Sequence, residues 1–244
     1  FNPLSRTRSD VVRWPCAAPG AEQTWQITDG ATGETIPSQY IRENDTGCLL
    51  FVARNVPSLG YKVYTVGDSV PTPPQMVWST NSGGLENKFY RVTCNHSGAI
   101  QSIWDKSTNR QIVRPGTQFN LYVNDGTIVT ASDVFVENVG PVGGNLWVQV
   151  SGLPLNTQSL STRIWLYADL DHIDITNEFA ISDAEQEIYY DFSMDLEGPL
   201  TFTLEGPSTT ILTAGRDEFD EARLAHWNTF SFIDVSSPDY GITL

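Results

Sequence analysis

Apolar and polar residues alternate along much of this 244-residue chain, in short runs separated by glycine, proline, asparagine and aspartate. Alternation with a period of two is typical of a β-strand that buries one face. Such strands are predicted near residues 11–14, 24–28, 48–53, 61–66, 88–93, 99–104, 119–123, 133–137, 146–151, 162–168, 172–179, 187–194 and 200–204. So many short strands predict an all-β fold of antiparallel sandwiches and not an α/β fold. The one helical pattern, residues 217–225, fits a loop equally well.

A stretch rich in proline and glycine, residues 71–84, divides this pattern into two parts. Proline and glycine interrupt a strand ladder and give a semi-rigid linker. We therefore expect a small β-sandwich at residues 1–70 and a large antiparallel sandwich at residues 85–244. The chain starts at Phe1 and stops inside an alternating run, residues 240–244. We expect a piece of a longer polypeptide, with the large sandwich truncated at its C-terminal end.

Acidic residues gather between residues 169 and 197, where no lysine or arginine interrupts them. Asp174 and Glu178 alternate with apolar residues, so a strand would place these acids on one face of a sheet. The alternating apolar positions, expected in the core, are Ile173, Ile175 and Phe179. A calcium site or a catalytic carboxylate pair needs oxygens that converge on one point. Strands spread side chains along a plane, so a solvated outer face is the favoured interpretation.

Histidine and cysteine are too sparse for the usual metal or nucleophile sites. The chain has three histidines, and none has a second histidine at a spacing that lets two imidazoles reach one zinc ion. Its three cysteines lie far apart and have no CxxC spacing. Small buried thiols are therefore the favoured interpretation of the cysteines.

Seven tryptophans raise the question of sugar binding, because an aromatic ring can stack on the apolar face of a pyranose. Most of them are expected to fill the core of a large sandwich. Trp165 has two interpretations, because it shares one strand face with Arg163 and Tyr167. This row could stack on a glycan or form a packed interface with the missing domain. Trp104 ends a predicted strand at a hairpin tip, where we expect a partly exposed ring.

Several segments of the chain resemble a known family. Residues 85–94 (LENKFYRVTC), 98–106 (GAIQSIWDK) and 118–122 (QFNLY) read as two strands and then a third. They are similar to the large C-terminal β-domain of glycoside hydrolase family 38, the α-mannosidases. Residues 1–12 and 232–243 are similar to other parts of the same β region. The resemblance implies a small β-domain followed by a supersandwich related to the galactose mutarotase fold.

The resemblance also implies what this chain lacks. It implies a zinc-dependent, retaining mannosidase whose metal ligands and aspartate nucleophile belong to an N-terminal domain. No position of this sequence matches those motifs, so we expect no catalytic residue, no metal ligand and no cofactor here. Zinc is expected in a catalytic domain that would lie before Phe1. After a segment like residues 118–122, many members have a tryptophan-flanked DAW stretch; here Asp125 and Asp133 keep the acids without the aromatic residues.

The chain is strongly acidic, with a formal net charge of -15 from 29 acidic and 14 basic residues. A surface of this charge without a basic cluster is a poor partner for nucleic acid or an anionic membrane. No apolar stretch is long enough to span a bilayer, so we expect a soluble protein. The sequence does not fix the compartment, and a cytoplasmic location is favoured.

We therefore expect a non-catalytic C-terminal β region of an α-mannosidase-like glycosidase, inactive on its own. Its partners would be the catalytic domain of the same polypeptide and a glycan or mannoside. A carbohydrate-binding module and a purely structural domain are the alternatives. The residues expected to contact a glycan are Trp104, Asp125, Asp133, Arg163, Trp165 and Tyr167.

Overall fold

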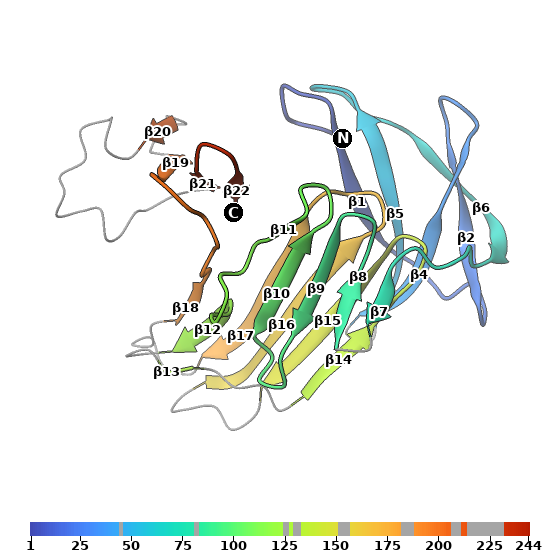
Figure 1. Cartoon of the computed structure of the whole chain (residues 1–244). Helices are drawn as coiled ribbons and strands as arrows, with labels where there is room; N and C mark the ends of the chain where they lie inside the picture. The colour runs from blue at the N-terminus through green and yellow to red at the C-terminus, as the bar shows by residue number, and fades with distance from the viewer. Residues whose placement is uncertain are drawn as a thin grey trace. The chain divides into compact units, whose positions relative to one another are not determined.

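The fold is all-β, as the alternation predicts. A computed structural model describes residues 1–43, 46–80, 83–123, 127–128, 133–150, 157–181, 188–205, 211–213 and 232–244 (Figure 1). Every regular element in these ranges is a β-strand, and every strand pairing is antiparallel. The helical pattern at residues 217–225 lies outside the described residues. The chain forms two compact units, one of residues 1–113 with 117–192 and one of residues 114–116 with 193–244.

The first unit begins with a small sandwich of two three-stranded sheets. One sheet has the order β1-β5-β4, with bounds Arg8–Pro15, Thr46–Val56 and Ser38–Glu43. The other has the order β3-β2-β6, with bounds Thr35–Ile36, Gln23–Asp29 and Tyr64–Pro71. Their shared core consists of Ile27, Ile36, Leu49, Phe51, Ala53 and Val56. Alternate residues of β5 thus supply one face of the small sandwich and leave the other face for a second neighbour.

Two larger sheets follow in the same unit. The five-stranded sheet has the order β11-β10-β9-β8-β7, with bounds Arg110–Gln111, Ile100–Asp105, Tyr90–Cys94, Gly84–Glu86 and Trp78–Thr80. The four-stranded sheet has the order β14-β15-β16-β17, with bounds Asp133–Glu137, Gly143–Val150, Thr157–Tyr167 and Ile173–Ile181. In Figure 1 the five-stranded sheet lies over the four-stranded one. Buried side chains of both include Leu85, Val92, Ile100, Ile103, Leu146, Val148, Ile164 and Leu166.

Two small sheets complete the description. In the first unit β12 (Asn120–Val123) lies between β13 (Thr127–Ile128) and β18 (Ile188–Asp191). The second unit has the strand order β20-β19-β21-β22, with bounds Ile211–Thr213, Thr201–Glu205, Ile233–Ser236 and Gly241–Thr243. The pair β21 and β22 lies in residues 232–243, one of the segments that carry the family resemblance.

The segment predicted as a linker, residues 71–84, has regular structure of its own. It contains β7, which pairs with β8 at the edge of the five-stranded sheet. Both sandwiches belong to one compact unit. The division into separate domains at residues 1–70 and 85–244 stays a prediction.

Candidate functional site on the four-stranded sheet

One face of the four-stranded sheet carries most of the polar and aromatic residues that the sequence singled out. Residues that lie opposite each other in antiparallel strands point to the same face. The register places Phe135 opposite Trp147, and Trp147 opposite Arg163. Two residues further along the strands, Asn145 lies opposite Trp165. After two more residues, Gly143 lies opposite Tyr167. We call this the aromatic face; the face on the other side of the sheet carries Leu146, Ile164 and Leu166.

The end of the aromatic face that holds Trp165 and Tyr167 is covered by the small sandwich, and we call it the covered end. Trp165 is 2% exposed and Tyr167 is 0% exposed. Their rings are parallel, with centroids 5.9 Å apart. The two rings share a core with Ile41, Leu50 and Val52 of the small sandwich. Val142 and Leu170, which flank strands of the four-stranded sheet, belong to the same core.

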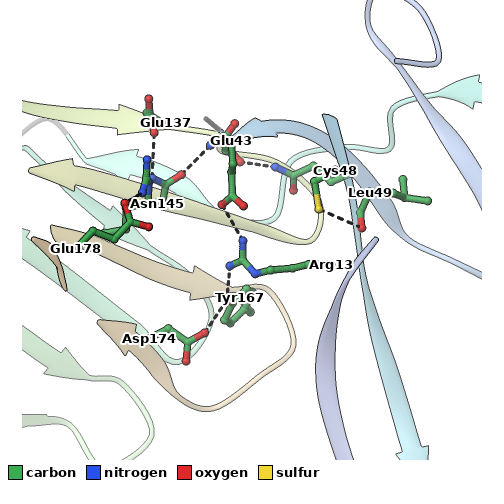
Figure 2. A network of polar contacts seen from close by, with 12 residues as sticks. Arg13, Glu43, Cys48, Leu49, Glu137, Asn145, Tyr167, Asp174 and Glu178 are labelled. Atoms are coloured by element: carbon green, nitrogen blue, oxygen red, sulfur yellow. Dashed lines mark hydrogen bonds and ion pairs between the residues drawn. The ribbon is translucent and has the colours of Figure 1, made fainter. Parts of the chain in front are cut away.

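Arg13 of β1 reaches into the covered end. Its guanidinium lies 4.4 Å from the centroid of the Trp165 ring, a cation–π geometry. It donates hydrogen bonds to the Tyr167 hydroxyl at 2.8 Å and to Glu43 at 2.7 Å (Figure 2). The Tyr167 hydroxyl in turn donates to Asp174 at 2.6 Å. Burial, together with the bond to Asp174, raises the pKa of Tyr167, so this hydroxyl stays a neutral donor.

Gln39 of β4 fixes the same interface through the backbone. Its side-chain oxygen accepts hydrogen bonds from the amides of Val142 and Gly143, each at 3.0 Å. Its side-chain nitrogen donates to the carbonyl of Asn138. A Cβ atom on Gly140 would lie 2.5 Å from the Gln39 side chain, so a larger residue here would displace Gln39 from its hydrogen bonds. Gln39 is 4% exposed, and its hydrogen bonds satisfy backbone groups that neither sheet pairs.

The other end of the aromatic face extends past the small sandwich, and we call it the open end. Phe135 is 43% exposed, and its ring lies 6.0 Å from that of Trp147 at a tilt of 43°. The guanidinium of Arg163 lies 5.3 Å from the Trp147 ring, on the same face. Arg163 also pairs with Glu178 at 2.9 Å, and the Glu178 side chain is 53% exposed. Asp133, also exposed, lies two residues before Phe135 on β14.

Two polar features mark the boundary between the ends. Asn145 is fully buried, donates to Glu137 at 3.2 Å and accepts from Asn138 at 2.9 Å. The indole nitrogen of Trp147 is enclosed and has no hydrogen-bond acceptor among the described residues. An enclosed donor without an acceptor is uncommon in folded proteins. Here it belongs to the tryptophan that supports the exposed Phe135.

The structure separates the six candidates expected from the sequence. Asp133 and Arg163 lie at the open end, whereas Trp165 and Tyr167 lie in the covered end, where neither ring presents a free face. The rings of that row are therefore packed under the small sandwich of the same chain. Trp104 is half-buried on β10, before the hairpin to β11, as expected for a strand end. Asp125 lies outside the described residues.

Two residues of the open end were missed by the sequence analysis. Phe135 alternates with Asp133 and Glu137 in a predicted strand, so the signal for an exposed aromatic ring between two acids was present. Trp147 carried a similar signal, because the residues two positions away on the same strand face, Asn145 and Gln149, are polar amides. Phe179, predicted to be in the core, is 50% exposed, so that expectation was wrong. It lies near the C-terminal end of β17, which pairs with β16 alone among the described strands.

The aromatic face offers hydrogen bonding and ring contacts, not metal chemistry. No three His, Cys, Asp or Glu side chains in the described ranges are grouped so as to hold a metal ion. The described residues also include no helix long and apolar enough to cross a membrane.

Comparisons with known proteins identify the fold. The chain is similar to an α-mannosidase from Enterococcus faecalis V583, with a TM-score of 0.64 and 13% identity. It is also similar to a protein of glycosyl hydrolase family 38 from Enterococcus faecalis, with a TM-score of 0.60 and 13% identity. These matches cover 99% of this chain but only 36% and 37% of the respective structures. The chain thus spans about a third of their length.

Sequence comparisons add nothing to this. No protein-family model matches the chain, and no curated protein sequence matches it. At 13% identity the structural likeness shows the fold. The resemblance stated from the sequence is therefore confirmed for the fold: this chain folds like part of the family 38 α-mannosidases.

Proposed function

We propose that this chain is the non-catalytic C-terminal β region of an α-mannosidase-like glycoside hydrolase. It buttresses a zinc-dependent catalytic domain of the same polypeptide and contributes a surface to glycan binding. The observation that supports this most is the likeness of nearly the whole chain to about a third of two such proteins. The remaining two thirds of those proteins have no counterpart here, and the motifs for zinc and for the nucleophile match no residue of this sequence.

The interface between the small sandwich and the aromatic face supports a buttressing role. It buries two aromatic rings and a glutamine, and a partly exposed arginine donates a hydrogen bond to the hydroxyl group of one of the rings. Hydrogen-bonded polar groups at such an interface help to specify one arrangement. A rigid pair of sandwiches is suited to holding a neighbouring domain in place.

The test is mannosidase activity towards an aryl α-mannoside, measured with and without added zinc. The isolated chain is expected to be inactive under both conditions. A longer parent polypeptide is expected to be active, with activity lost on chelation and restored by zinc. Activity in the isolated chain would contradict the proposal and would place a catalytic pair among the carboxylates of the large sandwich.

A carbohydrate-binding module is the second candidate function. The observation that favours it is the half-exposed Phe135, which lies between Asp133 and Glu137 on one strand face. It predicts that glycan binding is a property of this chain alone, whether or not a catalytic domain is attached.

A further inference from the structure

We propose that the open end of the aromatic face binds a neutral pyranose oligosaccharide, with the ring of Phe135 as the stacking platform. The inference deepens the proposed function, on which it rests for the choice of a mannoside as ligand. The site itself follows from the arrangement of the side chains at the open end.

Phe135 is a ring that its neighbours hold in place. One side of it contacts Trp147, and Arg163 supports Trp147 in turn. Arg163 is itself held by Glu178 and is only 12% exposed at its side chain. A side chain that is already fixed loses little freedom when a ligand binds, which favours affinity. Phe135 nevertheless keeps 43% of its surface exposed, so part of the ring is free to stack.

Polar groups flank the platform at the spacing of a strand. Asp133 and Glu137 are each two residues from Phe135 on the same face, roughly 7 Å away along the strand. Their carboxylates can accept hydrogen bonds from the hydroxyl groups of a sugar stacked between them. Glu178 adds a third carboxylate, against the single guanidinium of Arg163. The excess of negative charge favours a neutral glycan over an acidic one.

The covered end shows what protein packing on this face looks like, and the open end differs from it. The cover supplies aliphatic side chains, such as Ile41, Leu50 and Val52, against Trp165 and Tyr167. The described residues of the open end on this face include one aliphatic side chain, the small and exposed Ala180; the others are Asp133, Phe135, Trp147, Gln149, Ser161, Arg163, Thr176 and Glu178. The core of a protein interface is depleted in charged residues. Aromatic rings set among charged and amide groups instead match the mixed apolar and hydroxyl surface of a sugar.

The enclosed indole of Trp147 adds an independent observation. It lacks an acceptor among the described residues, although it lies directly beside the platform. A donor left without a partner is costly in a closed site, and a small turn of the ring toward a ligand hydroxyl would satisfy it. The fully buried Asn145, by comparison, has its partners within the chain.

The test is a calorimetric titration of the chain with a linear α-linked manno-oligosaccharide, at concentrations up to the millimolar range. We expect saturable binding that Phe135→Ala weakens roughly tenfold or more, as removal of a stacked ring should. Phe135→Leu keeps an apolar side chain at the same position, and we expect the same loss from it. Phe179→Ala removes an aromatic ring of similar exposure from the other face of the sheet and is expected to leave binding unchanged. A sialylated oligosaccharide of the same length is expected not to bind.

Two results would overturn the inference: no saturable binding by the wild-type chain, or equal affinity in wild type and Phe135→Ala. The activity assay separates this inference from the proposed function. If the parent hydrolyses the aryl mannoside but the chain binds no oligosaccharide, the site is wrong and the function stands. If the chain binds the oligosaccharide through Phe135 but the parent is inactive, the site stands and the glycosidase assignment is wrong.

Discussion

The two ends of the aromatic face make the same pairing of tryptophan and arginine in different surroundings. In the covered end, Arg13 comes from the small sandwich and lies over Trp165. In the open end, Arg163 comes from the sheet itself and lies over Trp147. The Trp165 ring of the first pair is enclosed by aliphatic residues although Arg13 itself is partly exposed, whereas the second pair supports an exposed ring. The pair of tryptophan and arginine therefore belongs to a packed interface at the covered end and supports an exposed surface at the open end.

The difference follows from which part of the same chain packs on each end of the aromatic face. β5 has buried residues on both faces, so the small sandwich has a second apolar surface to place on the sheet. That surface ends before the pair of Phe135 and Trp147. The sheet continues beyond it with charged and amide residues, which tolerate water. Stability should therefore depend on the covered end, and ligand binding on the open end.

The largest expected effect comes from removing the enclosed tryptophan. Trp165→Ala should lower the free energy of unfolding by about 3–5 kcal/mol, because it leaves a cavity and deprives Arg13 of its ring. Phe135→Ala, on the half-exposed ring of the open end, should cost under about 1 kcal/mol. Urea unfolding of both variants measures the difference. Equal losses would show that the two ends are not distinct in packing.

A smaller effect is expected from the glutamine that fixes the cover. Gln39→Ala removes an acceptor shared by two buried amides and should cost about 1–3 kcal/mol. The matched control is Gln26→Ala, since the Gln26 side chain makes one exposed hydrogen bond, to Thr35. We expect the control to unfold within about 0.5 kcal/mol of wild type. A Gln39 variant as stable as its control would mean that the cover is held by apolar contacts alone.

The smallest effects on stability are expected from two acids of the aromatic face, one at each end. Asp174→Ala removes the acceptor of the Tyr167 hydroxyl and should cost about 0.5–1.5 kcal/mol. Glu178→Ala removes an exposed ion pair with Arg163 and should change stability by less than about 0.5 kcal/mol. Thermal unfolding at matched pH resolves the two. A larger loss of stability from Glu178→Ala than from Asp174→Ala would show that the open end contributes more to stability than the covered end.

Most of the longer strands were predictable from the sequence, and the burial of their faces was not. The alternation around residues 162–168 gives the strand β16 and its apolar face correctly. Its polar and aromatic face was expected to contact a glycan or a missing domain, yet part of it is buried under the small sandwich of the same chain. The alternation of apolar and polar residues within one strand does not predict which surface a distant segment of the chain will cover. Phe179 shows the converse, because an apolar position near a strand end stays half-exposed.

Short strands with buried polar residues were missed for a related reason. β4 contains Ser38 and Gln39, which look like surface residues in the sequence but are 2% and 4% exposed. Each is buried because its side chain bonds to groups far along the chain. Such partners exist only in the folded structure. The open-end site was therefore half-predictable: Asp133 and Arg163 were candidates, while the pairing of Trp147 with Phe135 and Arg163 required the register of the sheet.

The most direct test of this account follows the indole N–H signals of the seven tryptophans during titration with the manno-oligosaccharide. Trp147→Phe and Trp165→Phe variants assign the two signals of interest in a ¹H–¹⁵N spectrum. The account predicts that the Trp147 signal shifts as the ligand saturates, whereas the Trp165 signal stays in place. A shift at Trp165 with none at Trp147 would contradict it, because the ligand would then be reaching the covered end and not the open one.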